Sequence, residues 1–143
     1  MNTSHYAVWP NRMPKSLTVP ESPLFDNLAV TAKRYPKKAC LHYYGTTITY
    51  EEVLHEVEKL SSYLLHELQV QPRDRVILLM QNAPQYVIAF YAILRAQAVV
   101  VPLNPMNTTN ELKFYLQDCE SKTAIVGQEL HEEISPLLKD TSL

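Results

Sequence analysis

The sequence predicts an α/β fold: a parallel sheet with helices on both faces, preceded by a helix and a β-hairpin. Apolar runs at 75–80 and 98–101 lack the alternation of half-exposed strands, which is typical of strands buried on both faces, and residues 123–126 are a third predicted strand. Helix-start signals separate these runs. Strand–helix–strand crossovers of this kind are right-handed in nearly all proteins, and they give a parallel sheet.

Start signals and apolar periodicity predict five helices. They span residues 22–35, 49–69, 84–96, 109–119 and 128–138. In a capping box, a Thr and a Glu three residues later each bond the other's backbone N–H; such boxes begin at Thr49 and Thr108. Asn82 is expected to cap the third helix, which is apolar on every side and therefore needs cover all round. Leu68 belongs to the apolar stripe of the second helix and Leu138 to that of the fifth.

The amino-terminal part is expected to contain no strand of the main sheet. Residues 1–21 hold three prolines and are predicted to form an extended arm, which Trp9 pins to the body. Ser22 is expected to cap the first helix. Residues 39–49 alternate in polarity and contain Gly45, which predicts a β-hairpin with its turn at that glycine.

Composition excludes several classes of function. The chain has 143 residues and a net charge of −2, with no basic surface for nucleic acid. The longest apolar stretch, residues 86–94, is about half as long as a membrane span. No secretory signal is visible, and Cys40 and Cys119 are expected to be free thiols. A cytoplasmic protein is therefore expected.

The two glycines, Gly45 and Gly127, are too few for a phosphate-binding loop. Such loops need clustered glycines so that backbone N–H groups can approach the anion. Cys40 and His42 would lie on one side of a strand, about 7 Å apart. No Asp or Asn is placed to orient the histidine, so a packed thiol is preferred over a nucleophile.

The remaining polar motifs also predict no catalytic or metal site. His-Glu pairs occur at 55–56 and 131–132, but the second histidine of a zinc-protease motif is replaced by Lys59 and Ser135. Strand ends in open α/β sheets usually carry the ligand contacts. Here they carry Gln81-Asn82 and Asn104-Pro105. Helix capping explains Asn82, whereas a ligand role and a turn before Pro105 both stay open for Asn104.

An ordered series of motifs runs through the chain. It reads ITYEE at 48–52, RDRV at 73–76, NAPQYVIAFY at 82–91, LRAQAVVVPLNP at 94–105 and ELKFYLQD at 111–118. The series resembles the adenylate-forming superfamily, and most closely its long-chain fatty acyl-CoA synthetases. Residues 23–25 and 34–36 resemble the opening helix of that family. Arg73 and Gln97 stand where the family usually has glycine, which costs roughly 1 kcal/mol where φ must be positive.

The resemblance implies a two-step reaction in the family. A fatty carboxylate attacks the α-phosphate of ATP, with magnesium offsetting charge, and the thiol of CoA then displaces AMP. The family's phosphate loop, nucleotide contacts and catalytic lysine lie downstream of the resembling segment. We therefore expect residues 22–143 to be the first part of an AMP-binding domain, with residues 1–21 as its arm. No catalytic, cofactor-binding or metal-ligating residue is assigned within the chain.

The same resemblance sets the expected partners and the alternatives. ATP, Mg, CoA and a fatty acid are implied for the parent enzyme, with a contact to the membrane that holds the substrate. The isolated fragment is expected to be inactive and to self-associate through uncovered apolar surface. An aryl-CoA ligase or an amino-acid adenylation domain stays open as the parent. A small α/β binding module without catalysis is the alternative from another class.

Overall fold

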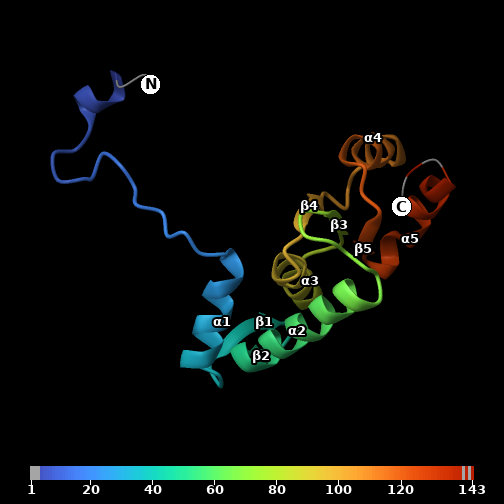
Figure 1. Cartoon of the computed structure of the whole chain (residues 1–143), viewed down its shortest axis with the longest axis horizontal. Coiled ribbons are helices and arrows are strands. Elements are labelled where there is room, and N and C mark those ends of the chain that lie inside the picture. The colour runs from blue at the N-terminus through green and yellow to red at the C-terminus, as the bar shows by residue number, and fades with distance from the viewer. Residues whose placement is uncertain (1–3, 140, 142) are drawn as a thin grey trace.

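A three-stranded parallel sheet lies at the centre of the fold (Figure 1), and it confirms the predicted α/β class. The computed structural model describes residues 4–139, 141 and 143. The helices are α1 (Leu24–Arg34), α2 (Tyr50–His66), α3 (Pro84–Arg95), α4 (Thr109–Cys119) and α5 (His131–Ile134), with short 3-10 turns η1 (Ser4–Val8), η2 (Gln128–Leu130) and η3 (Ser135–Lys139). The strands are β1 (Ala39–Tyr43), β2 (Thr46–Thr49), β3 (Arg75–Leu79), β4 (Val99–Leu103) and β5 (Thr123–Val126).

The strand order is β4-β3-β5, with both neighbours parallel to β3. Successive β3 side chains point to opposite faces of a sheet, and they feed two separate cores. Val76 and Leu78 pack with α1, α2 and α3, whereas Ile77 and Leu79 pack with α4, α5 and the turns beside it. The helices therefore cover both faces, as predicted.

Only β3 is buried along both faces. The expectation that the second strand is equally buried is wrong: β4 is an edge strand, and Val99 is 46% exposed. The edge position also explains why this strand continues through Pro102, because an edge strand does not need every N–H for pairing. The outer face of α3 is likewise only half-covered, with Phe90 and Tyr91 partly exposed.

The two predicted capping boxes are present. Thr49 Oγ1 accepts from the Glu52 N–H, and Glu52 accepts from the Thr49 N–H at 2.8 Å. Thr108 and Glu111 repeat this arrangement at α4. These hydrogen bonds hold the pKa of both glutamate carboxyls below the usual range.

Two predicted caps are wrong, and proline explains one of them. Residues before proline avoid the helical region, so Ala83 is extended and α3 can begin only at Pro84, one residue too late for Asn82 to cap it. At α1 the backbone of Pro23 takes the cap position, its carbonyl accepting from the Asp26 N–H at 3.0 Å. Ser22 therefore lies outside the helix.

Two apolar stripes end earlier than predicted. Helix α2 stops at His66, so Leu68 is 44% exposed and Val70 takes the buried place beside Leu64. After α5 the chain tightens into a 3-10 turn that contains Pro136. The tighter winding changes which side chain faces inward, so Leu137 is buried and Leu138 is 45% exposed.

The predicted β-hairpin is confirmed, with β1 and β2 antiparallel. Its turn uses Tyr44 and Gly45, both at positive φ, as in a type I′ turn. The amino-terminal arm differs from the prediction, because it contains the 3-10 turn η1 and runs away from the body (Figure 1). Trp9 does not pin it: the indole N–H donates to the carbonyls of Met13 and Pro14, within the arm itself.

Candidate functional site

The carboxyl ends of β3 and β4 meet at one edge of the sheet, because Leu79 lies opposite Leu103 in the parallel register. The chain leaves β3 towards α3 on one face and leaves β4 towards α4 on the other. Two neighbouring strands whose loops diverge in this way form the crevice where open α/β sheets usually bind ligands. A cleft of about 310 Å³ lies there.

This carboxyl-end cleft is lined by neutral side chains. They are Met80, Gln81, Asn82, Tyr86, Leu103, Asn104, Pro105 and Met106. The two strand-end pairs that the sequence indicated, Gln81-Asn82 and Asn104-Pro105, therefore line the same cleft. Tyr86 was not predicted to lie here, although its place in the first turn of α3, directly after the end of β3, is the signal that could have indicated it. The lining can donate hydrogen bonds to a polar group, but it offers no cation to a phosphate.

Asn104 takes the turn role that the sequence had left open. Its Oδ1 accepts from the Met106 N–H at 3.0 Å, and its carbonyl accepts from the Asn107 N–H at 3.0 Å. An Asx turn of this kind explains an asparagine before proline without any ligand. Asn82 does not cap α3, and its exposed side chain lines the same cleft.

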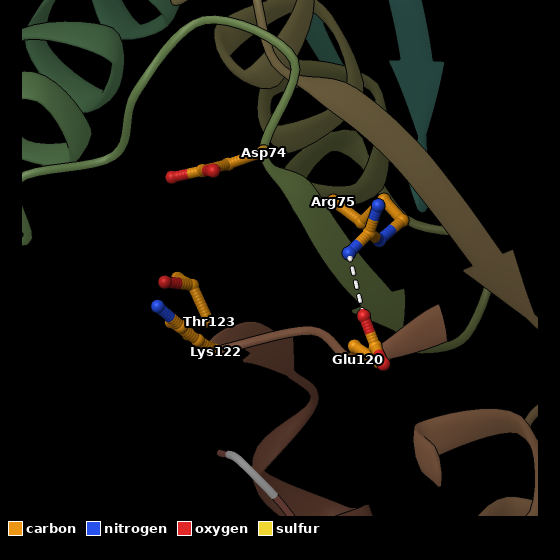
Figure 2. Close-up of a pocket in the computed structure, with 5 residues that line it drawn as sticks. All are labelled: Asp74, Arg75, Glu120, Lys122 and Thr123. Carbon is orange, nitrogen blue, oxygen red and sulfur yellow. Dashed lines mark ion pairs between the residues drawn. The ribbon is translucent and has the colours of Figure 1, made fainter. Parts of the chain in front are cut away.

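A second cleft, of about 330 Å³, lies at the amino ends of β3 and β5 (Figure 2). Its lining residues are Asp74, Arg75, Glu120, Lys122 and Thr123, and the first three bond to the protein itself. Arg75 Nη2 lies 3.7 Å from Glu120 Oε2, and its Nε donates to the Cys119 carbonyl. Asp74 accepts from the Gln71 N–H at 2.8 Å. These contacts hold the loops at the amino edge, the end of the sheet where ligands seldom bind.

Cys40 and His42 do not form a catalytic pair. A bulge in β1 turns Cys40 towards the first core together with Leu41. Burial raises the pKa of the Cys40 thiol, which disfavours the reactive thiolate. His42 instead lies across the hairpin, with Nδ1 3.0 Å from Thr47 Oγ1.

The His-Glu pairs lie on exposed helical segments, where Glu56 accepts from Lys59 Nζ at 3.1 Å. Across the described residues, 4–139 with 141 and 143, no group of three or more His, Cys, Asp or Glu side chains could hold a metal ion. Among the same residues no helix is long and apolar enough to cross a membrane.

Several proteins that are similar to this chain in sequence or in fold are acid–CoA ligases. A long-chain-fatty-acid–CoA ligase of Bacillus subtilis is 34% identical over 119 residues, which is 83% of this chain and 21% of the relative. The crystal structure of a long-chain-fatty-acid-CoA ligase from Archaeoglobus fulgidus superposes with a TM-score of 0.80 at 27% identity, over 90% of this chain and 27% of that one. The crystal structure of an anthranilate CoA ligase in complex with anthranoyl-AMP superposes with a TM-score of 0.74 at 26% identity, over 82% of this chain and 23% of that one.

The chain thus spans about a fifth to a quarter of the length of the curated relatives that it matches. The sequence profile of the AMP-binding enzymes matches residues 28–142, which include both cores and the carboxyl-end cleft. The sequence motifs, the sheet and the profile agree, and this chain belongs to the AMP-binding enzyme family.

Proposed function

We propose that this chain is the amino-terminal scaffold of an ATP-dependent long-chain fatty acid–CoA ligase. The observation that carries the proposal is the profile match over residues 28–142, combined with fatty-acid ligases among the relatives. In such an enzyme a fatty carboxylate attacks the α-phosphate of ATP and releases pyrophosphate. The thiol of CoA then attacks the acyl-adenylate and displaces AMP.

The described residues do not fit ATP, Mg or CoA, so we assign the chemistry to other parts of the parent enzyme. Gly45 serves the hairpin turn, and Gly127 lies against Glu129 at the end of β5. Neither belongs to a loop that could wrap a phosphate. The carboxyl-end cleft has no cation, and the charges of the amino-end cleft include Arg75 and Asp74, which bond to neighbouring loops.

A chimera tests the scaffold role. This chain would replace the matching first fifth of the B. subtilis ligase, and acyl-CoA formation from ATP, CoA and a long-chain fatty acid would be measured. We expect a folded chimera with readily measured activity, and isolated 1–143 that releases no pyrophosphate above background. A chimera that is soluble and cooperatively folded but inactive would refute the scaffold role. Pyrophosphate release by 1–143, lost on heating, would refute the inactivity.

An aryl-CoA ligase is the second candidate parent, because the anthranilate ligase shares the fold at 26% identity. A second chimera built on that enzyme separates the two. The fatty-acid parent predicts that this chain supports the activity of the fatty-acid chimera better than that of the anthranilate chimera, each relative to its own parent. The reverse ranking would favour the aryl-CoA ligase.

A further inference from the structure

A third cleft, of about 220 Å³, lies between α2 and α3, which pack together over the first core on one face of the sheet (Figure 1). Helix α2 supplies most of its lining, from positions whose helical spacing puts them on one face of the helix. Helix α3 supplies one residue from its last turn. The lining of this α2–α3 cleft consists of Glu58, Ser61, Ser62, Leu65, His66 and Arg95.

The polar side chains of the α2–α3 cleft are not used by the fold. Within residues 4–139, 141 and 143, none of them makes a side-chain hydrogen bond or an ion pair. The amino-end cleft differs, because there Asp74, Arg75 and Glu120 bond to the protein itself. Polar groups that gather in a cleft without protein partners are available to orient a ligand.

Ser61 gives the clearest sign that a ligand binds here. It is only 3% exposed and lines the cleft, and its Oγ has no hydrogen-bond partner among the described residues. A nearly buried hydroxyl without a partner costs stability. Alanine would avoid that cost and is also the better helix former in the interior of α2. Folding alone therefore does not explain the serine, whereas a ligand that accepts a hydrogen bond from Oγ does.

Arg95 is oriented to bind an oxyanion. Its guanidinium carbon lies 5.2 Å from the centroid of the Phe25 ring, which covers one face of the guanidinium. The N–H groups at the edge of the guanidinium form no hydrogen bond or ion pair with the described residues. A planar fork of this kind matches a phosphate group, to which two N–H groups can donate side by side. Ser61, Ser62 and His66 line the same cleft and add further donors.

Glu58 determines what else the ligand carries. Its carboxylate lines the same cleft and, when ionised, can only accept hydrogen bonds. It repels a bare phosphate but can accept from a hydroxyl group that is attached to one. The cleft is also smaller than the sites of drug-sized ligands, which enclose about 300–1,000 Å³. The ligand is therefore smaller than a nucleotide.

We propose that the α2–α3 cleft binds a small phosphomonoester whose organic part carries hydroxyl groups. The phosphate oxygens accept hydrogen bonds from Arg95 and Ser61, and Glu58 accepts from a hydroxyl group of the ligand. ATP and CoA are both too large for this cleft, so the site is separate from the chemistry of the parent enzyme. The inference rests on residues of this chain and does not depend on the ligase role.

An amide NMR titration of the full 143-residue chain tests the proposal. The ligands are glycerol 3-phosphate and ethyl phosphate, which lacks hydroxyl groups. We expect shifts confined to the second half of α2 and the end of α3, with glycerol 3-phosphate bound more tightly. Arg95→Met should weaken this binding about tenfold or more. Arg34→Met is the matched control, because Arg34 also lies over an aromatic ring, that of Tyr35, but outside the cleft. Glu58→Ala should make the two ligands bind alike.

Ser61→Ala separates a ligand role from a structural one. It should weaken the binding of glycerol 3-phosphate about tenfold, while the urea midpoint of the free protein stays the same or rises. Unchanged binding in this variant would overturn the proposal, as would equal effects of Arg95→Met and Arg34→Met. Tighter binding of glycerate, which has a carboxylate in place of the phosphate ester, would overturn the assignment to a phosphomonoester. The absence of shifts with either phosphate ligand would overturn the site itself.

Discussion

Gln97 holds a backbone conformation that favours glycine. Its φ is 60°, and it follows α3 in a complete Schellman motif. In this motif the Ala98 N–H bonds to the Ile93 carbonyl at 3.1 Å and the Gln97 N–H to the Leu94 carbonyl at 3.0 Å. The motif requires the left-handed conformation at this position, so we expect Gln97→Gly to stabilise the protein.

The expected gain is the difference between two terms. A non-glycine residue in the left-handed region costs about 1–2 kcal/mol. Glycine also lowers the free energy of unfolding by about 0.4–1 kcal/mol, because it gives the unfolded chain more conformational entropy. The Gln97 side chain is exposed, so its loss removes no packing. A net gain of about 0.5–1 kcal/mol remains, which for a domain of this size raises Tm by about 2–4 °C.

Arg73 is a second non-glycine residue at positive φ, and it is hydrogen-bonded to Gln97. It has φ 71° and follows Pro72 in a turn closed by the Asp74 N–H and the Gln71 carbonyl, the pattern of a type II turn. Its N–H donates to the Gln97 carbonyl at 2.8 Å. Arg73→Gly should give a similar gain, but the direct hydrogen bond means that the double variant need not be additive.

Urea and thermal unfolding followed by circular dichroism would measure these effects. Gln97→Ala is the key control, because it removes the side chain but keeps the strain, and it should give no gain. Glu67→Gly, at φ −93°, should destabilise. If Gln97→Gly is no more stable than Gln97→Ala, the strain argument is refuted.

Two further predictions concern charge and the sheet edges. The pKa values of Glu52 and Glu111 are lowered in the folded state, so their stabilisation is present above the unfolded pKa, about 4.3, and is lost as pH falls through the folded values. In the double variant Glu52→Gln and Glu111→Gln, the urea midpoint should fall less steeply as the pH drops below about 4.3. A midpoint that falls as steeply as in the unmodified protein would contradict this. The open edges of β4 and β5 predict self-association at rising concentration, which Val99→Lys should reduce in light scattering. A monomer that binds no hydrophobic dye would instead favour a self-contained binding module.

The sequence predicted the elements whose signals are local. Both capping boxes were found because Thr and Glu at the right spacing can satisfy each other without any tertiary contact. Strand β3 was found because burial on both faces leaves a continuous apolar run. The wrong cap at Asn82 came from giving the capping residue more weight than the restriction that Pro84 places on Ala83.

What the sequence could not predict depends on neighbours in space. A buried run does not say whether a strand is central or at an edge, so the exposure of Val99 was missed. The carboxyl-end cleft was anticipated only as two separate strand ends, because Gln81 and Asn104 meet through the sheet register. The family resemblance supplied what local patterns could not, namely that Arg73 and Gln97 occupy positions suited to glycine.

The alternation of side chains along β3 has a consequence for how the molecule opens. Val76 and Leu78 serve one core and Ile77 and Leu79 the other, and the two edge strands divide in the same way, with Val100 and Ile125 on the first core and Val101 and Ala124 on the second. The two halves therefore share the sheet, but each has its own layer of helices. The layer built from α4 and α5 can therefore loosen while the helices on the opposite face stay packed. Amide hydrogen exchange should then separate the chain into two cooperative units, with β3 protected for as long as either unit stays folded.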